Sequence, residues 1–491
     1  MHILYLDLDT LRPDHLGCYG YPRNTSPNLD SVAAAGCRFN QVYCSDAPCL
    51  PSRSALMSGR FGFNTGVVGH GGTAADPHLE GAKRDFTSTL GQTSLPAVLK
   101  QSGLHTAYIG GFGERHSAWW FYAGFREIHD SGLGGLESAE DVTPLALDWI
   151  QRNADAENWY LHINYWDPHT PYRAPRDFGN PFADDPFPGW MTPELLIQHQ
   201  SLPGPHSAQE VNMYDSSVDP RFPRQPGSVA DMVDWRKMID GYDCGIAYLD
   251  QHLGQLFTAL QQAGIWDDLA IIISSDHGEN LGELGMYAEH GTADALTCRI
   301  PLIIRWPGKK SGQIDNDLHY HLDLAPSLTD LLNLDSPEIW DGKRFSSALG
   351  GHPGTGREYL VLGQGAHVCQ RAVRWSDYIY IRTWHDGFHL FPEEMLFNLT
   401  ADPHEQINLA AQQQTQCETA AQLMGQWCQS HLDKLPEAKR SDPFDTVIRE
   451  GGPYHARGQL PAYLRRLNST GRGEHETELR RRHPQEFNRK D

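Results

Sequence analysis

The stretch LAIIISSDHGEN, residues 269–280, places a run of apolar residues directly before an acid, a histidine and a glycine. A short continuous apolar run of this kind is typical of a strand buried on both faces of a sheet. The stretch HILYLDLDT, residues 2–10, follows the same pattern and closes on Asp9. In sheets of parallel strands, functional groups gather beyond the carboxyl ends of the strands. We therefore expect Asp9, Asp276 and His277 to converge at one edge of a common sheet.

Helical segments separate the predicted strands. TAYIGG (residues 106–111) and WYLHINYW (residues 159–166) are typical of further buried strands, and SLPAVLKQSG (residues 94–103) is typical of a helix. Residues 238–264 carry helical periodicity over many turns, and RIPLIIRWPG (residues 299–308) indicates another strand. Strands that alternate with helices predict an α/β domain whose central sheet is mainly parallel and sandwiched by helices.

The character of the chain changes near residue 356. Short segments such as EYLVLG and EEMLFNL predict antiparallel strands, and QTQCETAAQLMGQWCQSHLDKL predicts a helix after them. We expect a large α/β domain over residues 1–355, a smaller α+β domain with an antiparallel sheet over 356–435, and an extension rich in Arg, Pro and Gly over 436–491. The favoured interpretation of the extension is a solvated surface segment; the alternative is an arm that lines the substrate cleft or a subunit contact.

Bulk composition excludes several classes of function. The chain has 491 residues, more than one ordinary core accommodates, and a formal net charge of −22. So acidic a protein is a poor partner for nucleic acids or anionic membranes, and an anionic substrate would need a local basic pocket. The sequence has no apolar run long enough to span a membrane. The first residues lack the pattern of a secretory leader, and we expect a cytoplasmic protein.

One cysteine stands apart from the others. The nine cysteines are odd in number and scattered, which is typical of free, buried thiols. The stretch CSDAPCLPSRSALMSGR, residues 44–60, instead places Cys49 ahead of a proline, a serine and Arg53, where a loop enters a helix. Three interpretations stand open: a buried thiol, a thiolate whose pKa is lowered by Arg53 and the helix N-terminus, and a precursor of a modified residue.

The third interpretation comes from a resemblance. The motif Cys-x-Pro-Ser-Arg followed by SALMSGR resembles the signature of the sulfatase family, in which a maturation enzyme oxidises the cysteine to formylglycine. The segments LDTLRPDHLGCYGY, IIISSDHGENLGELGMY, RIPLIIRWPG and LFNLTADPHEQINLA are similar to other parts of that family. The resemblance covers most of the chain and implies the alkaline phosphatase superfamily fold, in agreement with the α/β prediction.

The resemblance also implies a chemical reason for the aldehyde. An alcohol that attacks a sulfate ester forms a new ester that is about as hard to break as the first. A hydrated aldehyde has two oxygens on one carbon: one attacks sulfur, and the other then expels sulfate as the carbonyl forms again. The hydrate is also a hard oxygen ligand for a divalent cation.

The metal ligands implied by the resemblance are Asp9, Asp276, His277 and the modified Cys49. The commonest family pattern has two adjacent acids after the first strand, whereas this chain has Asp9 followed by Thr10. We prefer Ca²⁺, with Mn²⁺ and Mg²⁺ as competitors because a histidine is among the ligands. Asp7 lies two residues back on the same strand face, and we favour a structural role for it over a part in metal binding.

Further catalytic residues follow from the same resemblance. Arg53, four residues after Cys49, would pair with the sulfate or hold the hydrate. The region of the family's Gly-Lys-x-His element reads TAYIGGFGERHSAWWF here and has no lysine, so His116 would supply the base or donor and Arg115 the charge. His169, in NYWDPHTPY, would face the sulfate or protonate the leaving oxygen. His290 stands where the family often has a lysine, and it replaces that charge only when protonated.

The sequence therefore predicts a sulfate monoester hydrolase, acting on a sulfated small molecule or glycan and dependent on a formylglycine-generating partner. Phosphonate monoester or phosphodiester hydrolysis on the same scaffold is the alternative, and a non-catalytic glycan-binding relative is the rival from another class. Specificity is expected in loops such as residues 177–229. Trp119, Trp120 and Trp166 are equally compatible with stacking on a sugar ring and with packing in the core. The oligomeric state is left open.

Overall fold

A large mixed sheet forms the centre of the molecule. The computed structural model describes all residues except 79–87, 353, 355 and 488–491. The central strand β1 (His2–Leu8) pairs in parallel with β6 (Trp159–Tyr165) and with β7 (Leu269–Ser274), so the three strands end at one edge. In order across the sheet, the strands are β11 (Gln313–Asp315), β2 (Cys37–Tyr43), β10 (Arg299–Arg305), β7, β1, β6, β4 (His105–Ile109) and β5 (Glu127–His129), with β12 (His319–Tyr320) beside β2.

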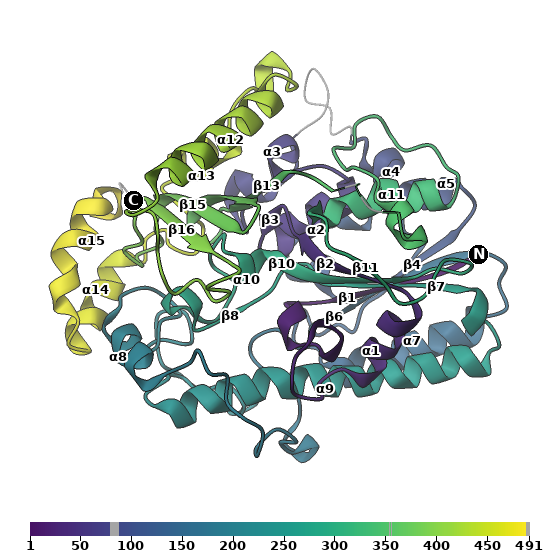
Figure 1. The fold of residues 1–491 in the computed structure, drawn as a ribbon, viewed down its shortest axis with the longest axis horizontal. Helices are drawn as coiled ribbons and strands as arrows, with labels where there is room; N and C mark the ends of the chain where they lie inside the picture. Colours follow the sequence, from purple (N-terminus) through teal and green to yellow (C-terminus); the bar gives the residue numbers. More distant parts are fainter. Residues whose placement is uncertain (79–87, 353, 355, 488–491) are drawn as a thin grey trace.

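Helices cover both faces of this sheet (Figure 1). The long helix α9 packs with α7 and α1 under one face, and α2, α5 and α11 cover the other. Each face buries its own large cluster of apolar side chains, which is the expected arrangement for strands that are apolar on both sides. The helices are α1 (Pro27–Ala35), α2 (Cys49–Ser58), α5 (Leu95–Gln101), α7 (Ala139–Asn153), α9 (Met232–Gln262) and α11 (Leu324–Leu331).

The predicted α/β class is confirmed, with one strand that runs against the others. Strand β10 pairs antiparallel with both β7 and β2. Its sequence, RIPLIIR, is as apolar as that of its neighbours, and an apolar run carries no information about strand direction.

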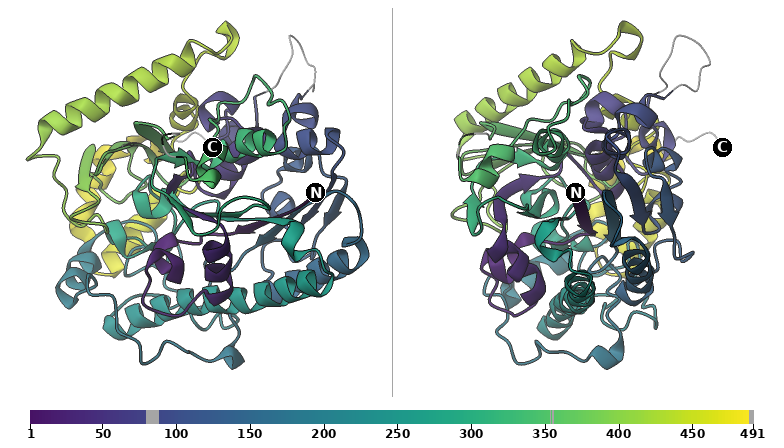
Figure 2. Two further views of the ribbon diagram at one scale, coloured as in Figure 1. Left: turned by 45° about the vertical axis from the view of Figure 1, so that its right-hand side comes forward. Right: turned by 90° about the vertical axis from the view of Figure 1, so that its right-hand side faces the viewer.

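A second sheet of five strands adjoins the first (Figure 2). Four of its strands pair antiparallel in sequence order, as predicted, and α12 (Gln414–Leu432) packs against them. The fifth strand, β3, comes from far upstream and pairs in parallel with β13. Its two residues lie just before α2, so the second sheet helps to place the start of that helix. The strands are β3 (Asp46–Ala47), β13 (Tyr359–Gln364), β14 (Cys369–Trp375), β15 (Tyr378–His385) and β16 (Glu394–Asn398).

The C-terminal extension is packed onto the rest of the protein. Helices α14 (Leu460–Ser469) and α15 (Glu476–Arg482) bury Tyr463 and four leucines, and Phe388 belongs to the same apolar cluster. Arg472 forms a buried ion pair with Glu210. The interpretation of this segment as a solvated surface extension was therefore wrong: its arginines point to carboxylates of the protein and not only to water. The helix α13 (Pro443–Arg449) precedes this pair and packs near β14.

Three further sequence predictions can be compared with the structure. The predicted boundary at residue 355 falls on a residue outside the described part of the chain, and the domain limits stay a prediction. Residues 177–229 are mostly irregular, as expected, but include the helix α8 (Pro193–Ser201). Among the helices that the structure describes, none has the length and apolarity needed to cross a lipid bilayer.

Candidate active site

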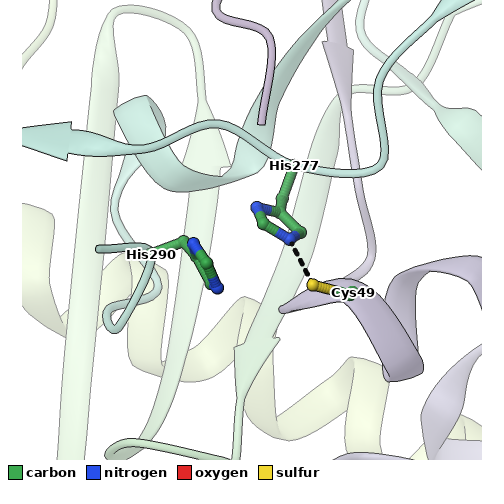
Figure 3. Close-up of side chains that lie close together, drawn as sticks. All are labelled: Cys49, His277 and His290. Atoms are coloured by element: carbon green, nitrogen blue, oxygen red, sulfur yellow. Dashed lines mark hydrogen bonds between the residues drawn. The ribbon is translucent and has the colours of Figure 1, made fainter. Parts of the chain in front are cut away.

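Cys49 is the first residue of α2 and faces the edge where the parallel strands end. Its side chain is 2 % exposed, and its sulfur lies 3.1 Å from Nε2 of His277 (Figure 3). Burial, followed by the charge of Asp9, raises the pKa of the Cys49 thiol to about 12 despite the nearby imidazole. A thiol with so high a pKa is a poor nucleophile near neutral pH, which argues against the interpretation of Cys49 as a reactive thiolate.

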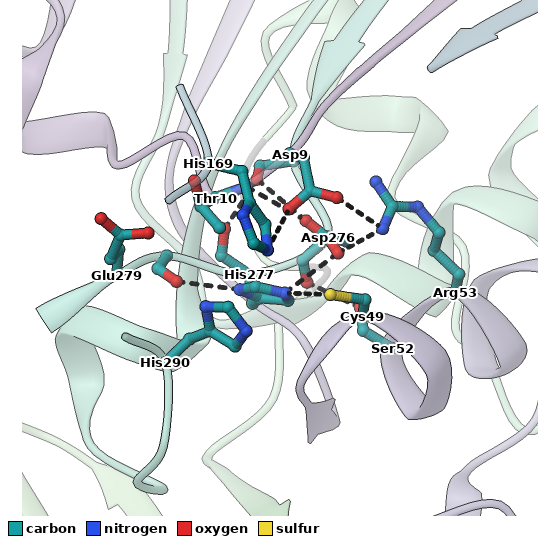
Figure 4. A network of polar contacts seen from close by, with 12 residues as sticks. Asp9, Thr10, Cys49, Ser52, Arg53, His169, Asp276, His277, Glu279 and His290 are labelled. Carbon is teal, nitrogen blue, oxygen red and sulfur yellow. Dashed lines mark hydrogen bonds and ion pairs between the residues drawn. The ribbon is translucent and has the colours of Figure 1, made fainter. Parts of the chain in front are cut away.

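Three residues from two distant segments meet this sulfur. One ligand atom each from Asp9, Cys49, Asp276 and His277 lies within 4.8 Å of the other three (Figure 4). The main chain fixes the two acids, because the amide of Asp9 donates to the carbonyl of Tyr165 at 2.9 Å and the amide of Thr10 donates to Oδ1 of Asp276 at 3.3 Å. The edge predicted from the ends of two apolar strands therefore holds the four residues together.

The donor set fits a divalent cation. Oδ1 of Asp9 is buried without a hydrogen-bond partner, and burial together with the charge of Asp276 raises the pKa of Asp9 to about 7. A buried carboxylate in this position is stabilised by a positive charge close to its free oxygen. Two carboxylates and one imidazole suit Mn²⁺ as well as Ca²⁺ and Mg²⁺. Asp9, Asp276 and His277 would hold the cation, with the modified side chain of residue 49.

Arg53 lies one turn after Cys49 and is fully buried. Its Nη1 lies 3.0 Å from Oδ2 of Asp9 and 2.6 Å from Oδ2 of Asp276, while Nε and Nη2 bind Asp7 at 2.8 and 3.1 Å. Asp7 also lies 3.3 Å from Nε2 of His162. Asp7 thus orients the guanidinium, in keeping with the structural role favoured for it.

His169 and His290 lie beside Asp9 and His277 in the same group (Figure 4). Nε2 of His169 is 4.0 Å from Oδ1 of Asp9, and the ring of His290 lies 4.2 Å from the ring of His277 between centroids. Burial lowers the pKa of His169 well below its usual value, and the neighbouring His290 and Arg173 act in the same direction. His290 also contacts Glu289, whose Oε1 is 3.0 Å from its Nε2.

His116 and Arg115 lie at the end of the short helix α6 (Phe112–Arg115) and differ in exposure. Nε2 of His116 is buried without a hydrogen-bond partner. Burial and the charge of Arg53 lower the pKa of His116 to about 3, so the ring is neutral at neutral pH. Arg115 is exposed, and its charge contributes to that same shift. His116 therefore lies close enough to Arg53, Asp276 and His277 for their charges to act on it, whereas Arg115 is exposed to solvent.

Sequence reasoning missed Arg173. This arginine is 9 % exposed, and it donates to the carbonyls of His169 and Gly135 at 2.8 and 2.9 Å. Its Nε is buried without a partner, and Asp9 is among the charges that act on its pKa. Arg173 follows His169 by four residues in the same segment, and this spacing is the signal by which it could have been found. It supplies a buried cation in a site that has no lysine near His116.

The three tryptophans have different environments. Trp120 and Trp166 are buried, and the indole of Trp166 donates to Glu137 at 2.9 Å. Trp119 is 69 % exposed. Two of the three therefore serve in packing, and Trp119 is the one available to stack on a ligand.

The residues of this site lie within a segment that matches a known protein family. The family model described as Sulfatase matches residues 1–334, and the model for the C-terminal part of N-sulphoglucosamine sulphohydrolase matches residues 282–431. A choline-sulfatase from Rhizobium meliloti is 28% identical over 444 residues, covering 78% of this chain and 77% of the relative.

Two solved structures have the same fold. A phosphonate monoester hydrolase of Agrobacterium radiobacter has a TM-score of 0.68 and 20% identity, covering 88% of this chain and 96% of that one. A protein solved in complex with its substrate, D-glucosamine-2-N,6-O-disulfate, has a TM-score of 0.67 and 19% identity, covering 89% and 99%. With a family model that spans most of the large sheet, and with Cys49 and Arg53 placed at its edge, the chain belongs to the sulfatase family of sulfuric ester hydrolases.

Proposed function

We propose that this protein hydrolyses sulfate monoesters of a sulfated carbohydrate, with residue 49 acting as formylglycine after oxidation by a maturation enzyme. The observation that carries the proposal is the position of the Cys49 sulfur, 3.1 Å from His277 and within one cluster with Asp9 and Asp276. A nucleophile, a cation site and proton-transfer groups must meet within a few ångströms for this reaction. Membership of the sulfatase family supports it independently.

The chain's own residues supply charge and proton transfer. Arg53 and Arg173 place two buried guanidinium groups near the acids, where they can offset the charge on the sulfate oxygens. His169 lies 4.0 Å from Asp9. Its pKa is well below the usual value in the free site, so we propose that the negative charge of a bound sulfate raises that pKa and lets the imidazole donate to the leaving oxygen. His277, whose Nδ1 lies 2.8 Å from the carbonyl of Gly278 and whose Nε2 lies 3.1 Å from Sγ of residue 49, is oriented with Nε2 toward the cation site and the modified side chain.

A modified side chain at residue 49 and a divalent cation would complete the site. Formylglycine, once hydrated, supplies a pair of geminal oxygens in place of the Cys49 sulfur. A divalent cation, when bound by Asp9, Asp276 and His277, lowers the pKa of an oxygen that it contacts. We propose Ca²⁺ as the resident ion, with Mn²⁺ and Mg²⁺ as the competitors to be tested by metal analysis.

The substrate class is supported by relatives. One structural neighbour was solved with a disulfated glucosamine as its substrate, and the choline-sulfatase relative indicates that the scaffold also accepts small sulfated alcohols. The exposed Trp119 offers a flat apolar surface of the kind that stacks on sugar rings. We propose a sulfated saccharide, with specificity set by residues 177–229.

The test is a mass spectrum combined with an assay. A peptide covering residues 46–53, prepared after expression with a formylglycine-generating enzyme, is expected to carry an aldehyde at position 49. Cys49→Ala is expected to lose all turnover of an aryl sulfate while keeping the wild-type melting temperature. An unmodified thiol in fully active protein would contradict the proposal, and so would activity in the alanine variant.

Phosphonate monoester hydrolysis is the second candidate, and one observation favours it. Thr10 stands where the common pattern has a second acid, and the metal-site cluster has only two carboxylates with His277. A phosphonate monoester hydrolase is also among the structural neighbours. Comparing kcat/KM for an aryl sulfate and for an aryl phosphonate of the same leaving group decides between the two. We expect the sulfate to be the better substrate.

A further inference from the structure

A second group of imidazoles lies beside the catalytic residues. His70 follows the short helix α3 (Gly62–Thr65), His367 lies between β13 and β14, and His455 belongs to the C-terminal extension. His367 faces His290 at 6.1 Å between ring centroids, and His290 in turn faces His277. The three histidines therefore adjoin the candidate active site without belonging to the set around Cys49.

The distances between their nitrogens match those of a metal site. Nδ1 of His70 lies 3.2 Å from Nε2 of His455, and one nitrogen from each of the three rings lies within 4.8 Å of the others. Two imidazoles bound to one tetrahedral Zn²⁺ place their nitrogens about 3.3 Å apart, as follows from Zn–N bonds of roughly 2.05 Å. The rings of His367 and His455 stack at 4.3 Å, which holds both in place.

The three rings are neutral, and the nitrogens of His70 and His455 that face each other have only a hydrogen bond between imidazoles. Burial lowers the pKa of His455 to about 4, with the neighbouring His206 and His290 adding to the shift. Nε2 of His70 is buried without a hydrogen-bond partner, and the nitrogen on the other side of that ring meets only another imidazole. In a hydrogen bond between two neutral imidazoles, one nitrogen donates a proton and only the other uses its lone pair. A cation between the two rings binds the lone pairs of both nitrogens.

Other clusters of potential ligands are already occupied by protein groups. Glu289 lies 3.0 Å from both His206 and His290, so its two oxygens have partners. In the group of His385, Asp386 and His483, an arginine at 2.8 Å neutralises the carboxylate. Within the described part of the chain, the side chains of His70, His367 and His455 contact other imidazoles, Tyr454 and Glu289, and none of the three is paired with an arginine or a lysine.

We propose that His70, His367 and His455 bind a second divalent metal ion, Zn²⁺ by ligand type, beside the hydrolytic centre. Three imidazoles with an open fourth position are a known ligand set for Zn²⁺. Glu289, whose Oε1 is 3.8 Å from Nε2 of His367, is placed to orient that ring and to balance part of the charge. The oxygen-rich set around Asp9 and Asp276 prefers a harder ion, so the two sites select different metals.

The test uses Co²⁺ as a spectroscopic substitute for Zn²⁺ in the full-length, metal-free protein. Tetrahedral Co²⁺ bound by nitrogen absorbs in the visible range far more strongly than six-coordinate Co²⁺ bound by oxygen. We expect one equivalent of strongly absorbing Co²⁺ in the wild type and in Asp276→Asn, which removes a ligand of the other site. His70→Asn and His455→Gln should each lose that absorption, and His352→Gln, at an exposed histidine, should keep it.

Zn²⁺ content gives a second measurement. Mass-spectrometric metal analysis of protein dialysed against equimolar Zn²⁺ should find one Zn²⁺ per chain in Asp276→Asn and far less in His455→Gln. Two variants are used because either one alone could fail to fold, and thermal melting confirms folding for each. Absorption and Zn²⁺ content that survive in His70→Asn and His455→Gln would overturn the proposal, and so would a wild type without tetrahedral Co²⁺. Loss of Zn²⁺ without loss of aryl sulfate turnover would leave the proposed hydrolytic function standing.

Discussion

Arg53 binds both carboxylate oxygens of Asp7, with Nε 2.8 Å from Oδ2 and Nη2 3.1 Å from Oδ1, and this pairing fixes the guanidinium behind Cys49. The remaining nitrogen, Nη1, is left to bridge Asp9 and Asp276. One buried cation thus compensates three buried carboxylates on two strands, and its geometry depends on the planar fork of arginine.

The first prediction concerns Arg53→Lys. A lysine keeps one charge but cannot hold Asp7 in a fork and bridge the other two acids, so the free energy of unfolding should fall by about 3–5 kcal/mol. Aryl sulfate turnover should fall with it. Thermal melting measures the first effect and steady-state kinetics the second. Arg344→Lys, at an exposed pair with Asp330, is the matched control and should melt like the wild type.

The second prediction concerns His169 and the leaving group. If His169 protonates the departing oxygen, His169→Ala should lose far more activity toward alkyl sulfates than toward 4-nitrophenyl sulfate, whose phenolate needs no proton. We expect a loss of about 10²–10⁴-fold for the alkyl ester, in keeping with the usual size of general acid catalysis. Equal losses in kcat/KM for both esters would mean that His169 orients the substrate instead.

The third prediction concerns acid stability. Burial lowers the pKa of His321 to about 4 and that of His385 and His389 to about 3. Between these values and about 6.5 the unfolded chain binds protons that the folded chain refuses, so stability falls as the pH falls. Each of the three rings should lower the free energy of unfolding by about 2 kcal/mol at pH 5 relative to pH 7.

Melting temperatures measured from pH 7.5 to pH 4.5 check this third prediction. His389→Gln should flatten the decline, because glutamine takes up no proton in either state. The exposed His352 provides the control, and His352→Gln should follow the wild-type curve. A wild type that melts at one temperature over the whole range would contradict the prediction.

The fourth prediction concerns the C-terminal extension. Arg472 is 2 % exposed and pairs with Glu210, which also accepts from Nε of Arg466 at 3.0 Å. Arg472→Leu removes the more deeply buried partner and should lower the free energy of unfolding by up to about 3–5 kcal/mol, since one arginine remains. Limited proteolysis should then release the extension before the rest of the chain. Arg465→Leu, at an exposed position of the preceding helix α14, should leave the cleavage pattern unchanged.

The sequence predicted the residues at the ends of the central strands better than the residues that surround them. Asp9 and Asp276 each follow an apolar run, and the carboxyl ends of parallel strands meet by geometry, so their convergence could be expected. Arg173 offers only its spacing of four residues after His169, and His455 carries no local signal, because both reach the site through irregular segments. Their positions depend on contacts with residues far away in the sequence, which periodicity does not encode.

The direction of β10, for which the sequence supports no prediction, and the burial of the extension, which was interpreted wrongly from the sequence, have a common physical cause. The direction of β10 and the burial of the extension are both decided by which surface a segment meets. An apolar strand such as β10 packs equally well in either direction. The arginine-rich helices of the extension, which have leucines on one face, remain solvated only if no complementary carboxylate is near. Glu210 and Asp386, both outside the extension, supply those carboxylates.

The pairing of β3 with β13 bears on when residue 49 can be processed. Gly363 and Gln364 lie opposite Asp46 and Ala47, and they leave the ribosome long after α2 has been synthesised. Until then the segment around Cys49 has no sheet to join and is open to another enzyme's active site. Once the strand pairs, Cys49 is buried in the interior, so the oxidation proposed for residue 49 would have to take place before this pairing forms.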